Sequence, residues 1–206
     1  MFGKEVLRIT KGTFLDKLRH SLEDSTAEYE SLVGEGYSLL HQYSQRFVIP
    51  LFIKAKKTIS TVELTTCGLV SDLLTGKSGA SDFFILGITP YTSEMKIKLG
   101  LSPDLLTHDG PGTVSPQSAH ALAQKVRQYS KSEIGLAETG MLPTNFKSRR
   151  TQKRAGEVFL AIDTVTKSTT IKLELNMELS RLLMRQEIAW NVLLALEDFL
   201  KAMDLP

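Results

Sequence analysis

Cysteine is nearly absent from this sequence of 206 residues, since Cys67 is the single one. One cysteine excludes an intramolecular disulfide and a thiolate-rich metal site. Chains without disulfides are typical of reducing compartments, so the composition favours the cytoplasm. No GxGxxG or Walker motif occurs, and the histidines show no ligand spacing; they are His20, His41, His108 and His120. We therefore expect no metal and no cofactor.

Long apolar runs and a strong net charge are also missing. The longest apolar runs, such as FFILGI, are far too short to cross a bilayer. The first residues contain no apolar segment of the kind that signal peptides carry. The formal net charge of +2 is too small to indicate a polyanionic partner. The sequence predicts a soluble, cytoplasmic protein without membrane contact.

Apolar residues are present in sufficient number for a core, at 42% of the chain. Residues 1 to about 25 are charged and weakly patterned. Apolar residues then recur at helical spacing from Ala27 to Phe47, although Gly34 and Gly36 interrupt them, so two helices are an alternative to one. We expect residues 1–50 to form a mostly helical N-terminal extension and residues 51–206 to form one α/β domain.

Strand and helix patterns alternate in the second part of the chain. Pro50 suits the first turn of a short helix, and Ser115 is a good N-cap before Pro116. The apolar run Phe83–Thr89 predicts a strand that is covered on both faces. Together with a late hairpin and a long last helix, the alternation predicts a three-layer α/β/α domain with a mixed sheet. The expected strands are Ile59–Val62, Phe83–Thr89, Ile134–Ala137, Glu157–Asp163 and Thr169–Leu175, and the expected helices are Cys67–Leu74, Ser93–Leu99, a short one within Leu101–Gly110, Ser115–Tyr129 and Glu178–Met203.

The stretch TVELTTCGLVSDLLTG turns from a strand directly into a helix, as in many α/β enzymes that present a nucleophile at such a turn. This stretch and later motifs resemble the C-terminal domain of the competence-damage protein CinA, which also occurs alone as nicotinamide mononucleotide deamidase. The resemblance covers about Leu51 to Leu200. The family's T-A-E-S-C-T-G-G, G-S-S and Y-S-N-E-A-K are similar to Thr61–Gly68, Gly79–Ser81 and Tyr91–Lys96. Its G-A-V-S, T-G-I-A-G-P, P-V-G-T-V and G-D-R are similar, in the same order, to Gly112–Ser115, Thr139–Pro143, Arg154–Val158 and Leu179–Arg181.

The resemblance implies hydrolysis of the carboxamide of nicotinamide mononucleotide, with a serine nucleophile and a lysine that takes its proton. A hydroxyl is a weak nucleophile until a base activates it, and a lysine can be that base only if burial lowers its pKa. Carried over to this sequence, the lysine is Lys96 and its tyrosine neighbour is Tyr91. The resemblance also implies a nucleotide-like ligand and a homodimer. The ligand-contacting positions that it implies are Thr66, Ser81, Thr139, Gly140 and Arg181.

The serine position of the family is occupied by Leu64, which has no hydroxyl or thiol. In subtilisin, loss of the nucleophilic serine lowers kcat by about 2 × 10⁶-fold, which corresponds to roughly 8–9 kcal/mol of barrier. Three substitutes lie close. Thr65 is one residue away, so its side chain is expected to point elsewhere, and Thr66 is expected to keep a supporting role. Cys67 is either a thiol activated by a helix N-terminus or a small buried apolar residue.

Two further features of the sequence concern the binding of a ligand. Met141, Leu142 and Pro143 replace a glycine-rich turn, which predicts a smaller or reshaped pocket. Arg181 and Arg185 share one helix face near the helix N-terminus, where the dipole disfavours cations. We expect either a carboxylate, from Glu174 or Glu178, or a bound anion such as a phosphate to compensate them.

Each implied site residue also has a structural interpretation. Lys96 could be solvated, Tyr91 could pack at a strand end, and Ser81 and Thr139 could satisfy turn backbone. The basic segment Lys147–Arg154 is either a solvated loop or an electrostatic lid for phosphorylated ligands. It lacks the aromatic residues of single-strand binders, so nucleic acid is not an expected partner.

The sequence leaves two classes of function open. In the first, the chain has lost the serine–lysine machinery and binds a nucleotide-like molecule or a protein partner. In the second, it is an active nicotinamide-nucleotide amidase, or a related amide hydrolase, that uses Lys96 with a substitute nucleophile.

Overall fold

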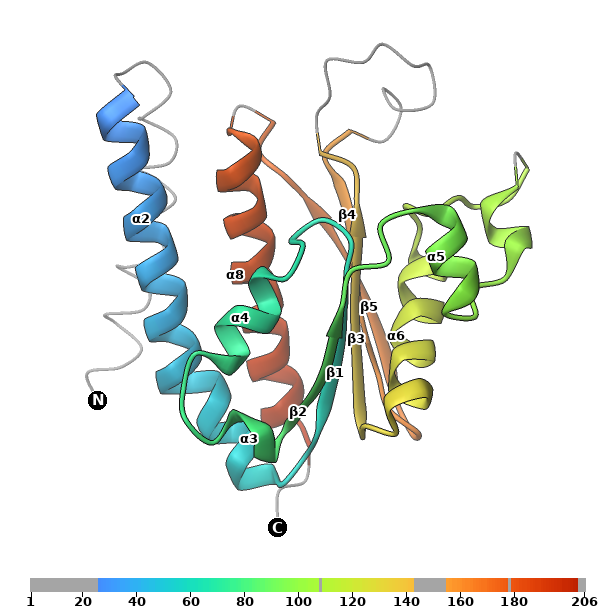
Figure 1. Cartoon of the computed structure of the whole chain (residues 1–206), viewed down its shortest axis with the longest axis horizontal. Coiled ribbons are helices and arrows are strands. Elements are labelled where there is room, and N and C mark those ends of the chain that lie inside the picture. The colour runs from blue at the N-terminus through green and yellow to red at the C-terminus, as the bar shows by residue number, and fades with distance from the viewer. Residues whose placement is uncertain (1–25, 108, 143–154, 178, 204–206) are drawn as a thin grey trace.

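The computed structural model describes residues 26–107, 109–142, 155–177 and 179–203 (Figure 1). Its centre is a five-stranded sheet with the strand order β2-β1-β3-β4-β5. The strands β2, β1 and β3 are parallel, and β4 and β5 run antiparallel to their neighbours. The predicted mixed sheet is therefore confirmed. The strands are β1 (Ile59–Glu63), β2 (Phe84–Ile88), β3 (Ile134–Gly140), β4 (Glu157–Asp163) and β5 (Ser168–Glu174).

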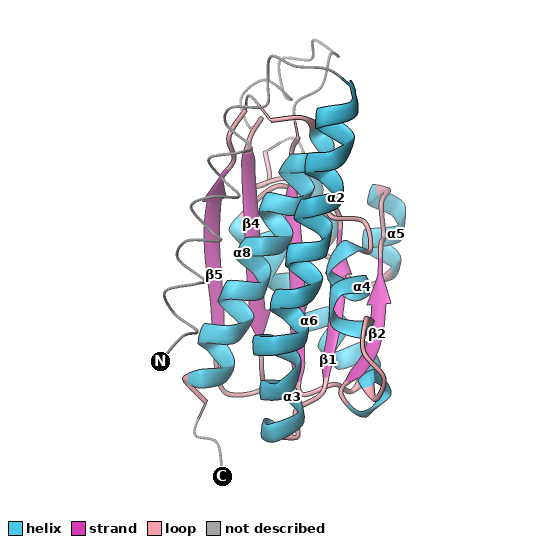
Figure 2. Ribbon diagram, turned by 90° about the vertical axis from the view of Figure 1, so that its left-hand side faces the viewer, coloured by secondary structure: helices cyan, strands magenta, loops and turns pink. Residues whose placement is uncertain are grey.

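Helices cover both faces of the sheet, as the three-layer prediction requires (Figures 1 and 2). One face carries α2 (Thr26–Tyr43), α3 (Ile49–Ala55), α4 (Leu69–Thr75) and α8 (Arg181–Lys201). The opposite face carries α5 (Ser93–Lys98) and α6 (Pro116–Ser130). Two apolar clusters fill the spaces between the layers, the larger one under α2, α4 and α8 and the smaller one under α6. None of the described helices is long and apolar enough to cross a membrane.

The first described helix is continuous, so the alternative of two helices is wrong. Gly34 and Gly36 lie inside α2, and a π-helical turn, Ser44–Val48, joins α2 to α3. An interior glycine costs roughly 1 kcal/mol in a helix, but Leu32, Leu40 and Tyr43 bury the helix against the core. Tertiary burial thus outweighs the local propensity.

The strand β2 corrects a second prediction. It lies at the edge of the sheet and its residues are alternately half-buried and exposed, so it is not covered on both faces. Ile85 is 47% exposed. A continuous apolar run does not distinguish a central strand from an edge strand, because both can carry branched apolar residues.

Side-chain caps fix the ends of the longer helices. The hydroxyl of Ser115 accepts the N–H of Ser118 at the start of α6, which confirms the predicted N-cap. Ser180 caps α8 in the same way by accepting the N–H of Leu183, so this helix begins at Arg181. The predicted segments 1–25, Lys147–Arg154, Pro143, His108 and Glu178 lie outside the described residues.

Candidate functional site

The loop after β1 is held by the carboxylate of Glu63. Its oxygens accept the N–H groups of Gly68, Val70 and Ser71 at 2.9, 2.9 and 2.8 Å. These donors belong to the first turn of α4, where helical N–H groups have no partner within the helix. The turn also needs left-handed backbone at Cys67 (φ 53°) and Gly68 (φ 99°). The local sequence therefore converts a strand into a helix within a few residues.

A second carboxyl group, that of Glu138, holds the same loop from β3. Glu138 lies beside Glu63 in the parallel register of β1 and β3. Its Oε1 accepts the N–H groups of Thr65 and Thr66, each at 2.7 Å. Glu138 is fully buried, and its Oε2 has no hydrogen-bond partner among the described residues. Burial raises the pKa of Glu138, although the hydrogen bonds from Thr65 and Thr66 oppose the shift.

The last helix supplies a third contact to this loop. Arg185 on α8 donates from Nε and Nη2 to the carbonyl oxygen of Thr66, with Nε at 3.2 Å. Two carboxyl groups and one guanidinium thus fix the loop on its buried side. Position 64 is consequently presented in one orientation at the carboxyl end of β1.

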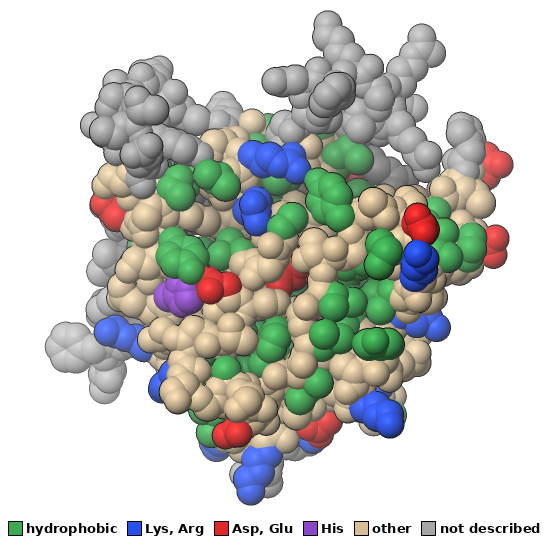
Figure 3. Space-filling model, viewed as in Figure 1, with side chains coloured by type: hydrophobic (Ala, Val, Ile, Leu, Met, Phe, Trp, Pro, Cys, Tyr) green, Lys and Arg blue, Asp and Glu red, His purple; other side chains and the backbone are tan. Residues whose placement is uncertain are grey.

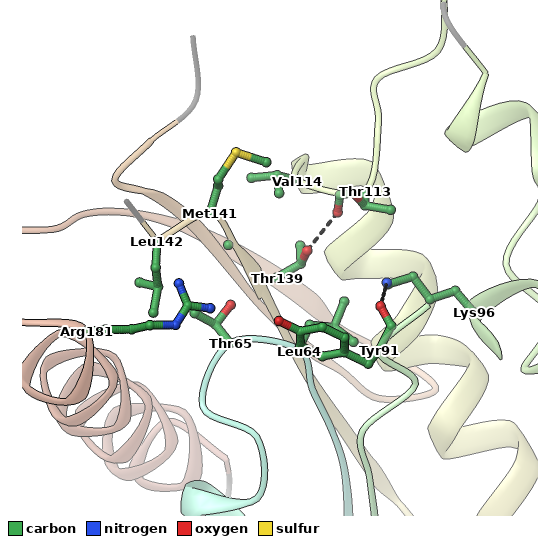
Figure 4. Close-up of a pocket in the computed structure, with 11 residues that line it drawn as sticks. Leu64, Thr65, Tyr91, Lys96, Thr113, Val114, Thr139, Met141, Leu142 and Arg181 are labelled. Atoms are coloured by element: carbon green, nitrogen blue, oxygen red, sulfur yellow. Dashed lines mark hydrogen bonds between the residues drawn. The ribbon is translucent and has the colours of Figure 1, made fainter. Parts of the chain in front are cut away.

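A cavity of about 140 Å³ opens at the carboxyl ends of β1 and β3 (Figure 4). The chain leaves β1 through α4 on one face of the sheet and reaches β3 through α6 on the opposite face. Ligands of α/β proteins bind at the carboxyl ends of strands whose connections diverge to opposite faces in this way. Among the described residues, no aspartate or glutamate lines the cavity. The lining residues are Leu64, Thr65, Tyr91, Lys96, Thr113, Val114, Thr139, Gly140, Met141, Leu142 and Arg181.

Lys96 is the buried cation of this cavity, with 6% of its surface exposed. Its Nζ donates to the carbonyl oxygen of Tyr91 at 2.7 Å, and no carboxylate of the described residues pairs with it. Burial lowers the pKa of Lys96, because desolvation disfavours the charged ammonium. The lysine therefore has the environment that a base or a nucleophilic amine requires.

Two threonines line the cavity with different hydrogen bonds. The hydroxyl of Thr139 donates to the carbonyl oxygen of Thr113 at 2.7 Å. The hydroxyl of Thr65 is buried and has no partner among the described residues. Thr65 and Leu64 both face the cavity (Figure 4), contrary to the expectation that Thr65 points elsewhere. The alternation of side chains ends with the strand at Glu63, so neighbouring residues no longer point to opposite faces.

The cavity brings together six of the eight residues that the resemblance implies: Leu64, Tyr91, Lys96, Thr139, Gly140 and Arg181. Thr66 is absent from the lining, because its hydroxyl is buried between Glu63 and Glu138. Ser81 lies in a short 3₁₀ turn, Ala80–Asp82, just before β2. This turn is at the amino ends of the parallel strands, whereas the cavity is at their carboxyl ends. The structure therefore does not place Thr66 or Ser81 at this cavity.

The other candidate residues, Cys67, Arg181 and Arg185, have different surroundings. Cys67 is exposed and is not among the residues that line the cavity, so the interpretation of Cys67 as a small buried apolar residue is wrong. Arg185 is compensated by the Thr66 carbonyl, whereas Glu174 pairs with Lys172 at 3.2 Å. Arg181 is exposed, lines the cavity and has no ion-pair partner among the described residues. A free anion remains a ligand that Arg181 could hold.

Sequence reasoning missed Glu138 altogether. The available signal was one acidic residue inside the apolar strand GLAETG, since a buried charge is rare without a partner. Thr113 and Val114, which also line the cavity, lie in the segment Gly112–Ser115 that resembles the family's G-A-V-S, but they were not singled out as site residues. In the described part of the chain, no three His, Cys, Asp or Glu side chains gather into a group that could bind a metal ion.

Comparison with known proteins gives consistent matches. Residues 41–200 match the model of the CinA C-terminal domain. A competence-damage inducible protein of Caldanaerobacter subterraneus is 32% identical over 176 residues, which cover 84% of this chain and 42% of that relative. The chain spans less than half the length of this relative and of two similar curated relatives from Thermoanaerobacter. The crystal structure of the competence/damage inducible protein CihA from Agrobacterium tumefaciens superposes with a TM-score of 0.69 at 25% identity, over 79% of this chain and 95% of that one. The competence damage-inducible protein A of Klebsiella pneumoniae has the same fold, with a TM-score of 0.71 at 17% identity over 80% of this chain and 99% of that one.

Proposed function

The chain belongs to the CinA C-terminal domain family, and from this premise we propose that it binds a nucleotide-like anion without hydrolysing it. The observation that carries the proposal is Leu64, which lines the cavity at the position of the family's nucleophile. Leucine can neither attack a carbonyl carbon nor give up a proton. In subtilisin, loss of the nucleophile raises the activation barrier by roughly 8–9 kcal/mol. Neighbouring side chains do not compensate for a loss of this size.

The charges around the cavity support an anionic ligand. Lys96 and Arg181 line it, and no acidic residue of the part of the chain that the structure describes does so. A cavity of about 140 Å³ is smaller than the roughly 300–1,000 Å³ of typical ligand sites. The side chains of Met141 and Leu142 take up part of the room that glycines would leave. A mononucleotide would therefore enter with one end and keep the other near the surface.

One observation favours an amidase as the second candidate. The unpaired hydroxyl of Thr65 lies in the same cavity as Lys96. A lysine of lowered pKa that shares a cavity with a hydroxyl can serve as the base that activates it. In this second function, Thr65 attacks the carboxamide and Lys96 takes the proton.

The test is incubation of the purified chain with nicotinamide mononucleotide, with nicotinic acid mononucleotide as the quantified product and calorimetry as the binding readout. Binding without product supports the proposal. Product that disappears in Thr65→Val supports the amidase, and the absence of binding contradicts both. Leu64→Ser is run alongside, because product from this variant alone shows that only the nucleophile is missing.

The homodimer and the cytoplasmic location stay predictions. Large apolar side chains, Ile85, Tyr91, Met95 and Ile97, are 40–61% exposed on β2, on α5 and in the segment between them, and Figure 3 shows apolar side chains grouped over this side of the molecule. Burial of such a group between two copies is favourable. Sedimentation velocity at several concentrations measures whether the chain pairs.

A further inference from the structure

We propose that the amine of Lys96 forms an imine with small anionic aldehydes or 2-oxo acids that enter the cavity. The inference rests on the proposed function in one respect, since it uses the same cavity as an anion site. It goes beyond that function because it assigns a covalent reaction to the lysine. The reacting class is a carbonyl compound with a carboxylate group.

The surroundings of Lys96 favour a nucleophilic amine. The side chain is buried, with 6% of its surface exposed, and its one hydrogen bond within the described chain is to the carbonyl oxygen of Tyr91. A carboxylate would hold the ammonium charged, but among the described residues none pairs with Lys96 and none lines the cavity. Desolvated lysines without a counter-ion are those that form imines in proteins.

The opposite side of the cavity can hold the anionic end of the molecule. Figure 4 shows Arg181 and Lys96 on opposite sides of Leu64, Thr65 and Thr139. The Arg181 guanidinium is a fixed fork of donors that suits a carboxylate. The unpaired Thr65 hydroxyl is a further donor on this path. A molecule with a carboxylate at one end and a carbonyl at the other matches this order of groups.

The leucine that prevents serine chemistry suits this reaction. Leu64 lines the cavity between the two cations and contributes an apolar surface that keeps the amine desolvated. Size also fits, since an apolar cavity of about 150 Å³ holds a molecule with six heavy atoms such as benzene. A three-carbon 2-oxo acid has the same number of heavy atoms, and glyoxylate has one fewer.

The step balances without any co-reactant. The nitrogen lone pair of Lys96 attacks the carbonyl carbon, and the C=O π pair moves to oxygen. A proton passes from nitrogen to that oxygen to give a carbinolamine. Loss of water then leaves the C=N bond, so aldehyde and amine become imine and water. No group is oxidised or reduced in this step.

The experiment is reductive trapping on the unmodified chain. Glyoxylate and cyanoborohydride are added at pH 7, and peptide mass spectrometry measures carboxymethylation at each lysine. Lys98 is an internal control, because it lies two residues away, is 63% exposed and pairs with Glu94 at 2.8 Å. We expect Lys96 to react at least about threefold faster than Lys98, since the lowered pKa of Lys96 leaves a larger fraction of its amine unprotonated at pH 7.

Arg181→Gln and a neutral aldehyde test the anionic part. We expect Arg181→Gln to slow the reaction of Lys96 with glyoxylate severalfold and to leave its reaction with propionaldehyde unchanged. Equal rates at Lys96 and Lys98, no product at Lys96, or an equal effect of Arg181→Gln on both aldehydes overturns the inference. Calorimetry with nicotinamide mononucleotide separates the two proposals. Binding without trapping overturns the imine alone, and the absence of both overturns the anion site as well.

Discussion

The carboxyl groups of Glu63 and Glu138 share one hydroxyl, because Thr66 Oγ1 lies 2.8 Å from Oε2 of Glu63 and 2.8 Å from Oε1 of Glu138. A hydroxyl has one proton to donate, so the two carboxyl groups compete for it. Burial raises the pKa of Glu138, although the hydrogen bonds from Thr65 and Thr66 oppose the shift. Two buried carboxyl groups thus hold the loop through one shared hydroxyl, and burial favours the protonated form of Glu138.

This protonation makes stability depend on pH. Because the folded-state pKa of Glu138 is raised, the folded chain binds more protons than the unfolded chain, and stability falls as pH rises from the unfolded pKa toward the folded one. We expect Glu138→Gln to remove this contribution, which reaches at most about 1.4 kcal/mol per pH unit. Urea unfolding of both proteins from pH 4 to 8 measures the difference. Glu174→Gln, at an exposed position on β5, is the control that should keep the wild-type slope; an unchanged slope in Glu138→Gln contradicts the assignment.

We expect substitution of Arg185 to lower the stability of the chain and substitution of Arg181 to weaken ligand binding. Arg185→Ala removes two donors from the buried carbonyl of Thr66 and leaves it the N–H of Leu69 at 3.3 Å, a change that we expect to cost about 1–3 kcal/mol. Arg181→Ala removes an exposed side chain, so its unfolding free energy should change by less than about 0.5 kcal/mol. Ligand affinity should instead fall in Arg181→Ala. Thermal unfolding and calorimetry with nicotinamide mononucleotide measure both quantities, and a large loss of stability in Arg181→Ala would contradict the description of this residue.

The prediction from sequence succeeded where local patterns decide. Ser115 capped its helix and the hairpin of β4 and β5 formed as expected, because caps and alternation act over a few residues. The prediction that β2 is covered on both faces was wrong. Whether a strand lies at the edge of a sheet depends on which strands pair, and its own residues do not decide this. The residues that converge on the cavity came from the resemblance. The side-chain directions of Thr65 and Thr66 could not be predicted, because a turn with left-handed residues has no fixed alternation.

Two glycines are expected to respond oppositely to alanine. Gly34 lies in α2, and a Cβ at this position would meet no described atom outside its own helix within 4 Å, so Gly34→Ala should stabilise the chain by roughly 1 kcal/mol. At Gly135 on β3, a Cβ would come within 2.0 Å of the carbonyl oxygen of Ala123 on α6. Backbone cannot move aside cheaply, so Gly135→Ala should destabilise by about 1–3 kcal/mol or more. Urea unfolding of the two variants measures both, and destabilisation by Gly34→Ala would show that α2 is not the continuous helix described.

Lys96 should give the chain a pH dependence opposite in sign to that of Glu138. Its folded-state pKa is lowered, so the unfolded chain binds more protons and stability rises with pH up to the unfolded value. We expect Lys96→Met to be more stable than the wild type at pH 7, and the difference to shrink by pH 10. Lys98→Met, at an exposed position, is the matched control. A constant difference across this range would show that Lys96 does not titrate abnormally.

The contact from Arg185 to Thr66 joins residues 119 positions apart in the chain. During synthesis, the loop at the end of β1 leaves the ribosome long before α8 is made. The N–H donors of the loop can meet Glu63 early, and the carbonyl of Thr66 can accept the N–H of Leu69. The two donors of Arg185 arrive only with the last helix, and Glu138 arrives in between. The site is therefore completed late in folding. A ribosome-bound chain that ends before Arg185 should pair β2, β1 and β3 in the native order, but its loop after β1 should lack the contact with α8.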